Sequence, residues 1–413
     1  MKAVILIFVL IINSYSLTLK NSLEIALENS PLVSIASSQI RYNKHLKSEA
    51  DSAYHPVLDV GFQRQELAQT GAFIYSPTHN YNLALKYNIF NGFSDSANIK
   101  SKQYEVESSK LEYATANADL KLSVVIAYTN YLKARKNIKV QMNQLSSLTK
   151  QYDDTLVRFE QGVIAKNELL LIDLDKLKAE QSVYKAKSNL RIVRSNLQKV
   201  IGVKIDDQEM IEDFNTTIPE VEDIYVLENE MMNNRSEVKA LENKRLSVLS
   251  QKDVVQGRYL PRLDAEILHQ INDKERRFND SLVQPKDQTT FNINLQWNLY
   301  SGGSDEYKRR SLLERSTQIN YKLDELKLEL TNQLNKAYED LKVAKNAKNV
   351  ASRAKESAQE NYRISSDKYR YGRIDALSLL VSQSNLTQAI NAYNNAYYDV
   401  FIAFRTLARI VKE

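Results

Sequence analysis

Residues 291–300 alternate strictly between apolar and polar side chains. Phe291, Ile293 and Leu295 would share one face of a strand, while Asn292 and Asn294 would share the other. A helix does not produce this alternation, because its apolar positions recur with a longer period. The stretch therefore predicts a strand of about ten residues, the length and pattern of a wall with lipid on one side and water on the other.

Three further stretches, at 56–66, 82–91 and 262–270, show the same alternation, although His269 interrupts the last. One such strand is also compatible with a half-buried sheet of a soluble protein. Four of them favour a membrane wall. The polar faces, predicted to line a lumen, carry Asn82, Lys86, Asn88, Asp264, Glu266, Asn292, Asn294, Gln296 and Asn298. The apolar faces, predicted to meet lipid, carry Leu83, Leu85, Tyr87, Ile293, Leu295 and Trp297.

Long helices are expected between the strands. The chain has only nine Gly and six Pro in 413 residues, so few positions interrupt a helix. Leu120, Val124, Tyr128 and Tyr131 are spaced by three or four residues, which is typical of a coiled-coil seam. We expect a long helix to start near Ser94 and the chain to turn back at about 145–149.

The first 16 residues have the features of a secretory signal peptide: a lysine, a short apolar run and small polar residues. The run is too short to cross a bilayer, and no later stretch reaches the required length of about 20 apolar residues. A membrane location would therefore require a barrel. The chain has no Cys, which excludes disulfides and thiol catalysis. Its 56 basic and 51 acidic residues are mixed, so we expect no nucleic-acid partner.

The plan of the chain occurs twice. The segment at 54–58 returns at 259–263, and the segment at 88–92 returns at 298–302, with offsets of 205 and 210 residues. We expect a first structural repeat over 17–202, a connector over 203–222 and a second repeat over 223–413.

Several motifs together resemble the TolC family of outer-membrane channel proteins. They are Ser-Leu-x-x-Ala-Leu-x-Asn-x-Pro at 22–31, Leu-Pro-x-Leu at 260–263, the strand-to-Gly-Gly turn at 302–303, and aromatic-x-x-Gly ending at Gly162 and Gly372. Their order and doubling cover the whole chain after the signal peptide. Phe93 departs from the pattern, because it stands where the second repeat has a second Gly.

The resemblance implies a mainly α fold with long antiparallel coiled-coil helices and four transmembrane strands per chain. Four strands cannot close a barrel, since about eight are needed, so identical copies must share one. The resemblance implies a homotrimer with a 12-stranded barrel in the outer membrane of a Gram-negative bacterium, extending into the periplasm. It also implies a passive efflux or type I secretion duct that works with a periplasmic adaptor (membrane fusion) protein and an inner-membrane pump or ABC transporter.

Such a duct must close at its periplasmic helix tips. Gly162 and Gly372 are candidate helix breaks there, with a packing role alone as the alternative. The resemblance places polar contacts near Glu168, Tyr369, Arg373 and Asp375, our candidates for holding the aperture closed, with solvated surface charge as the alternative.

Catalytic and cofactor motifs are absent from the sequence. The four His residues are scattered, and no spacing matches a metal site, a phosphate loop or a catalytic dyad. We therefore expect neither an enzyme nor a cofactor. The competing interpretation is a soluble periplasmic coiled-coil adaptor or scaffold protein without a pore, which explains the helices but not the four alternating stretches.

Overall fold

The computed structural model describes residues 17–66, 78–206, 211–214, 218–273, 276–279, 282–284 and 286–412. The predicted signal peptide at 1–16 lies outside these residues. The chain divides into two compact units. One contains residues 1–35, 114–235 and 327–413, and the other contains residues 36–113 and 236–326.

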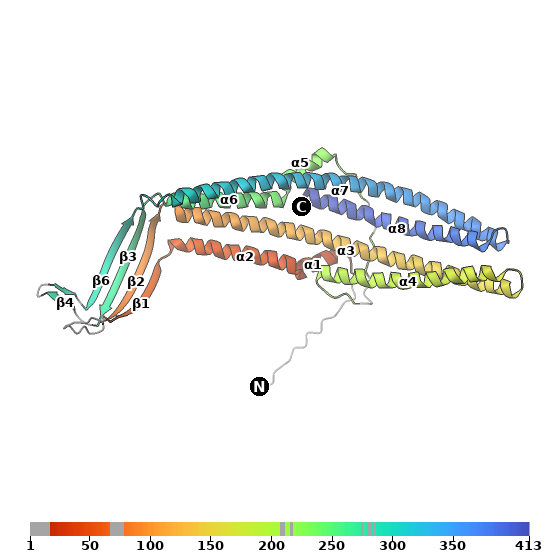
Figure 1. Ribbon diagram of the computed structural model, residues 1–413, viewed down its shortest axis with the longest axis horizontal. Helices are drawn as coiled ribbons and strands as arrows, with labels where there is room; N and C mark the ends of the chain where they lie inside the picture. The colour runs from red at the N-terminus through yellow and green to blue at the C-terminus, as the bar shows by residue number, and fades with distance from the viewer. Residues whose placement is uncertain are drawn as a thin grey trace, which may run out of the picture. The chain divides into compact units, whose positions relative to one another are not determined.

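Two 67-residue helices, α3 (Ser94–Glu160) and α7 (Ser304–Arg370), run through both units (Figure 1). At a rise of 1.5 Å per residue, each is about 100 Å long. No Gly or Pro interrupts either helix, which is why such a length is possible. Both start and end with an offset of 210 residues, the offset found in the sequence repeat.

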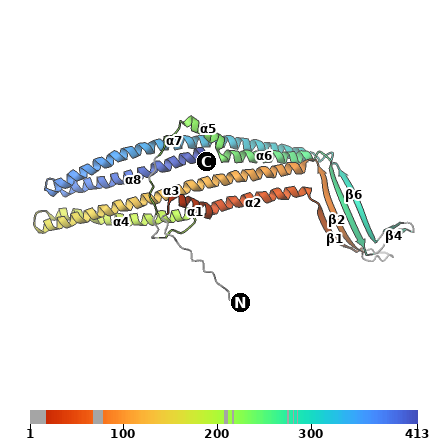
Figure 2. The same cartoon turned by 180° about the vertical axis from the view of Figure 1, so that it is seen from behind.

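The described part of the first unit is mainly helical. It contains α1 (Leu19–Asn29), α4 (Lys166–Ile201), α5 (Ile224–Asn234) and α8 (Ala376–Lys412) with the adjoining parts of α3 and α7. α4 runs back along α3, and α8 runs back along α7, as both views show (Figures 1 and 2). Its core is formed by fully buried side chains, among them Tyr128, Leu132, Ile172, Leu197, Met231, Leu334 and Tyr398.

The expected reversal near 145–149 is wrong, because α3 continues to Glu160. Leu148 in that stretch is buried and packs against α4, so the helical conformation is stabilised there by tertiary contacts. The chain instead reverses at 161–165, where a glycine permits the turn.

The second unit contains the sheet together with α6 (Ser236–Gly257), most of α2 (Pro31–Asp51), and the remaining parts of α3 and α7. Val248, Val255 and Leu312 form its helical core. A short 3-10 helix, η1 (Ser52–Tyr54), leads from α2 into the first strand.

The connector at 203–222 belongs to the first unit and forms no helix in the parts that the structure describes.

Four strands form one antiparallel sheet in the order β1-β2-β3-β6. They are β1 (Val57–Gln65), β2 (Thr78–Asn91), β3 (Arg262–Asn272) and β6 (Asp287–Gln296). β4 (Arg276–Asn279) and β5 (Leu282–Gln284) form a separate small hairpin. Among the described strands, β1 and β6 are the two edges of the larger sheet.

Candidate functional site

The strand register gathers polar side chains on one face of the sheet and apolar side chains on the other. Lys86 lies opposite Glu266, and Glu266 lies opposite Asn292, which makes a polar row across three strands. The next residues along the strands form an apolar row of Leu85, Ile267 and Phe291. The polar face collects the eight predicted lumen residues that lie in strands: Asn82, Lys86, Asn88, Asp264, Glu266, Asn292, Asn294 and Gln296.

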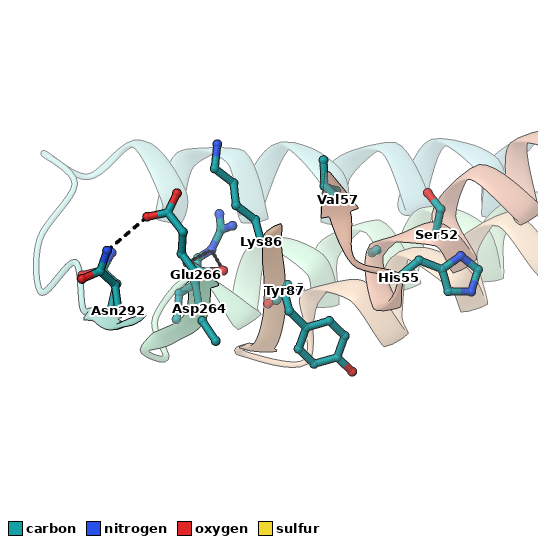
Figure 3. A pocket seen from close by; sticks show the side chains of 13 residues that line it. Ser52, His55, Val57, Lys86, Tyr87, Asp264, Glu266 and Asn292 are labelled. Carbon is teal, nitrogen blue, oxygen red and sulfur yellow. Dashed lines mark hydrogen bonds and ion pairs between the residues drawn. The ribbon is translucent and has the colours of Figure 1, made fainter. Parts of the chain in front are cut away.

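Charges on the polar face are partly compensated by neighbours. Lys86 Nζ lies 2.9 Å from Asp59 Oδ2, and Asn292 Nδ2 donates to Glu266 Oε2 at 3.4 Å. Arg262 Nε lies 2.8 Å from Asp264 Oδ2. The face is hollowed by a cavity of about 380 Å³, in which these polar side chains gather (Figure 3). This surface is suited to contact with water and ions.

The opposite face is apolar and uncovered in the single chain. Val60 on β1 is 82% exposed and Ile293 on β6 is 62% exposed, values that a water-soluble sheet would avoid over a whole face. The predicted lipid-facing residues that lie in strands all fall on this face: Leu83, Leu85, Tyr87, Ile293 and Leu295. Polar side chains also occur on this face, toward the strand ends far from α3 and α7: His269 lies opposite Thr289, and His269 Nδ1 lies 2.9 Å from Thr289 Oγ1.

The predicted strand at 290–300 ends earlier than expected. β6 stops at Gln296, so Trp297 and Asn298 lie beyond the strand rather than in it. The indole Nε1 of Trp297 donates to the carbonyl oxygen of Tyr259 at 3.0 Å. The alternation of the sequence extends through residue 300, but within the single chain β3 pairs with β6 only as far as Gln296.

At the other end of the chain's long helices, the two candidate helix breaks lie in matching turns. Gly162 follows α3 with φ +72°, and Gly372 follows α7 with φ +65°. The amide of Val163 donates to the carbonyl of Arg158, and the amide of Arg373 donates to the carbonyl of Lys368. These bonds close a Schellman motif, in which a left-handed residue ends the helix.

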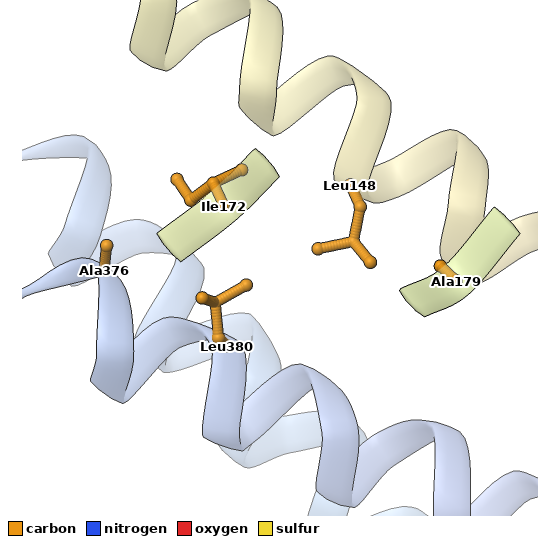
Figure 4. Packing of buried hydrophobic residues seen from close by; sticks show 5 residues of the cluster. All are labelled: Leu148, Ile172, Ala179, Ala376 and Leu380. Atoms are coloured by element: carbon orange, nitrogen blue, oxygen red, sulfur yellow. The ribbon is translucent and has the colours of Figure 1, made fainter. Parts of the chain in front are cut away.

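Tyr369 is the best-anchored of the four aperture candidates. Its hydroxyl lies 3.4 Å from the Thr155 hydroxyl of α3, and the Arg158 guanidinium lies over its ring at 5.6 Å. The ring also packs against a buried cluster that joins α3, α4 and α8 (Figure 4). The cluster consists of Leu148, Ile172, Ala179, Ala376 and Leu380. Tyr369 therefore links the two helical hairpins of this unit within a single chain.

The other three candidates have different surroundings. The Asp375 carboxylate accepts from the Ser378 amide at 3.0 Å and so caps α8. Hydrogen bonding by Ser378 holds the pKa of Asp375 below its ordinary value. Glu168 is half-buried in the first turn of α4, and Arg373 is exposed in the turn before α8. Within the described part of the chain, no ion pair joins Glu168 to Arg373.

A polar cluster that holds the connector was missed by sequence reasoning. The hydroxyl of Tyr128 lies 2.6 Å from the carbonyl oxygen of Glu212 and 2.9 Å from that of Leu17, which share its single proton. Tyr398 donates to Asp213 at 2.8 Å. Burial raises the pKa of Tyr128. Burial alone would raise the pKa of Asp213. Hydrogen bonds from Lys136 and Tyr398 outweigh the effect of burial, so the pKa of Asp213 is lowered. Tyr128 appeared in the sequence only as a seam position, because its partners are distant in the chain.

None of the helices that the structure describes combines the length and the apolar character needed to cross a bilayer. Over the same residues, His, Cys, Asp and Glu side chains form no group of three or more that could hold a metal ion.

Comparison with protein-family models tests the family membership that the sequence motifs suggested. A family model described as outer membrane efflux protein matches residues 22–203 and 227–411, which include α3, α4, α6, α7, all strands of the large sheet and most of α5 and α8. The chain belongs to the outer membrane efflux protein family. It is thus an outer-membrane efflux channel. The family consists of channels and is not a family of enzymes. The alternative of a soluble adaptor is not supported by this family.

Solved structures of outer-membrane channels and of an outer-membrane protein share the fold. The Campylobacter jejuni CmeC outer membrane channel matches with a TM-score of 0.83 and 16% identity, over 95% of this chain and 85% of that one. The Vibrio cholerae outer membrane protein VceC matches with 0.78 and 13%, over 95% and 96%. The open state of the Neisseria gonorrhoeae MtrE channel matches with 0.78 and 14%, over 95% and 88%. No curated protein sequence matches the chain.

Proposed function

We propose that three copies of this chain form one passive exit duct through the outer membrane, with the polar faces of their sheets lining a shared 12-stranded barrel. The observation that supports this most directly is the four-stranded sheet with two open edges, β1 and β6. In lipid, each unpaired backbone N–H or C=O costs several kcal/mol, so open edges must be paired. Three copies supply a strand number compatible with a water-filled barrel.

The strand directions are compatible with such closure. The order β1-β2-β3-β6 alternates in direction, so β1 and β6 run antiparallel to each other. β6 of one copy can therefore pair with β1 of the next in the same antiparallel manner as every pair inside the chain. The apolar face would then form a continuous lipid-facing belt.

We further propose that the duct works with a periplasmic adaptor protein and an inner-membrane pump or ABC transporter, and that it closes at the helix tips. Tyr369 supports the second part, because it ties α7 to Thr155 and Arg158 of α3 next to the glycine turns. Glu168, Arg373 and Asp375 lie within the same tips, on α4, in the α7–α8 turn and at the start of α8. We propose that Glu168 and Arg373 contribute contacts between neighbouring copies.

Bilayer recording of the detergent-purified protein tests this function. We expect a complex with the mass of three chains and a single-channel conductance that is low in the wild type, because the tips are closed. Tyr369→Phe removes only the hydroxyl that reaches Thr155, and Arg373→Ala and Glu168→Ala remove the proposed contacts. Each should raise the conductance. Tyr307→Phe, on the exposed first turn of α7, is the matched control and should leave it unchanged. A stable monomer without conductance would refute the duct.

A further inference from the structure

The two hairpins of the sheet have the same register. Val57 lies opposite Lys86 in the first hairpin, and Arg262 lies opposite Gln296 in the second. Arg262 follows Val57 by 205 positions, and Gln296 follows Lys86 by 210. All the pairs of β1 with β2 map onto pairs of β3 with β6 by these two offsets. The sheet is therefore a structural duplication at the level of single residue pairs.

A closed barrel of such hairpins contains two kinds of seam between hairpins. One is the seam of β2 with β3, which lies inside the chain and whose register is known. The other, which rests on the proposed trimer, is the seam of β6 with β1 of the neighbouring copy. Since β6 is the counterpart of β2 and β1 is the counterpart of β3, the internal seam is a template for the seam between copies.

We infer that β6 pairs with β1 of the neighbouring copy in the register of the internal seam. Leu85 lies opposite Ile267 inside the chain, so Leu295 lies opposite Phe62 of the neighbouring copy. By the same mapping, Tyr87 opposite Ala265 places Trp297 opposite Val60. Asn88 opposite Asp264 places Asn298 opposite Asp59 of the neighbouring copy.

The early end of β6 is an independent observation that supports pairing of β6 with a neighbouring β1. In β2, residues 87–91 lie beyond the last pair with β1, at Lys86, and they are strand because β3 pairs with them. Their counterparts in β6 are residues 297–301, which have no such partner in the single chain and are not strand. Residues 57–60 of a neighbouring β1 would supply the missing partner and extend β6 along the alternating sequence.

The chemistry of the inferred pairs is consistent on both faces. Trp297 with Val60, and Leu295 with Phe62, place apolar residues opposite apolar residues, whereas Asn298 with Asp59 places an amide opposite a carboxylate. A slip by one residue would mix the two faces. A slip by two residues would keep each side chain on its face, so the faces alone do not select the register. The duplication of the hairpins selects it.

Cysteine pairs test the register, because the natural chain has no Cys. Directly opposed residues have Cα atoms about 4.5–5.5 Å apart, within disulfide range, whereas diagonal neighbours are about 7–8 Å apart. We expect the double variant Leu295→Cys with Phe62→Cys to form disulfides between chains under mild oxidation. The pairs Leu295→Cys with Val60→Cys and Leu295→Cys with Arg64→Cys should lose that product. Asn294→Cys with Gln63→Cys repeats the test on the polar face.

The internal pair Leu85→Cys with Ile267→Cys is the matched control, and it should lose its free thiols without linking chains. If an offset pair links chains and the aligned pair does not, the inferred register is overturned and the trimer stands. If no pair links chains while the control oxidises, β6 does not meet β1 of another copy, and both the register and the proposed duct fail.

Discussion

At the scale of single residues, the two helix tips differ although their backbones match. Asp375 caps α8 through the Ser378 amide, whereas its counterpart before α4 is Ala165, which provides no side-chain cap. The lowered pKa of Asp375 means that the capping carboxylate is ionised at neutral pH. Its contribution to stability is lost only as the pH falls through that lowered pKa. The second repeat therefore has the better-defined helix start at its tip.

Hydrogen exchange followed by mass spectrometry at neutral pH checks the importance of this cap. We expect Asp375→Ala to speed exchange in peptides that cover the first turn of α8, because the Ser378 amide loses its acceptor. Asp375→Asn keeps an acceptor oxygen and is the control. Conversely, Ala165→Asp should slow exchange at the start of α4. Unchanged exchange in Asp375→Ala would show that tertiary contacts, not the cap, order this turn.

Glycine and phenylalanine at the β2–α3 turn show how a local rule can be overridden. Gly92 has φ +58°, and a Cβ there would lie 2.0 Å from the carbonyl oxygen of Gly257, so only glycine fits. Phe93 has φ +65°, an uncommon conformation for a bulky residue. Its ring makes an edge contact with Phe90 at 5.1 Å, which offsets part of the strain. Phe93 thus adopts the conformation that Gly303 has in the second repeat.

At the scale of elements, a small apolar cluster joins the two helical hairpins near their tips, beside polar contacts such as that of Tyr369 with Thr155. Ile172 of α4 is fully buried in a cluster with Leu148 of α3 and Leu380 of α8 (Figure 4). Its neighbour Leu170 is 56% exposed in the single chain. We therefore expect the packing of α3, α4 and α8 near the tips to depend strongly on the Ile172 side chain.

Thermal unfolding followed by the helical circular-dichroism signal checks this dependence. We expect Ile172→Ala to destabilise the protein by about 2–4 kcal/mol, through lost burial and a residual cavity. Ile172→Val should cost about 1 kcal/mol. Leu170→Ala, on the same helix, should cost less than Ile172→Ala because its side chain is largely exposed. Equal losses for Ile172→Ala and Leu170→Ala would mean that contacts between copies, not this cluster, dominate the stability of the tip.

At the scale of the whole molecule, the polar face of the sheet sets the electrostatics of the proposed lumen. Lys86 lies beside Asp59 and opposite Glu266, so one cation balances two carboxylates in each copy. In a closed trimer these groups would form a ring, and rings of charged side chains control which ions pass a channel. Tyr87, the next residue along β2, lies on the apolar face and is the natural control.

Reversal potentials in a salt gradient across planar bilayers check the role of this ring. We expect Lys86→Glu to shift the reversal potential toward greater cation selectivity, because a third carboxylate would replace the cation that lies beside Asp59 and opposite Glu266. Lys86→Met should shift it in the same direction by less. Tyr87→Phe should leave it unchanged. A shift caused by Tyr87→Phe, or none caused by Lys86→Glu, would show that this face does not line the ion path.

Local periodicity made much of this protein predictable from its sequence. Alternation with period two identified the four strands and their apolar faces, and seam spacing identified the long helices, because both patterns depend on neighbours along the chain. The glycines at 162 and 372 were recognisable because few residues adopt a positive φ. The duplication was visible from short segments that return with constant offsets.

Tertiary structure alone decided what depends on residues far apart in the chain. The reversal beyond Leu148, the strand register, the end of β6 at Gln296 and the anchoring of the connector by Tyr128 each need a partner more than 10 positions away. Sequence periodicity shows which face a residue occupies, but not which residue lies opposite, since a slip by two preserves every face. That choice follows from backbone pairing across the sheet, which exists only once the strands have met.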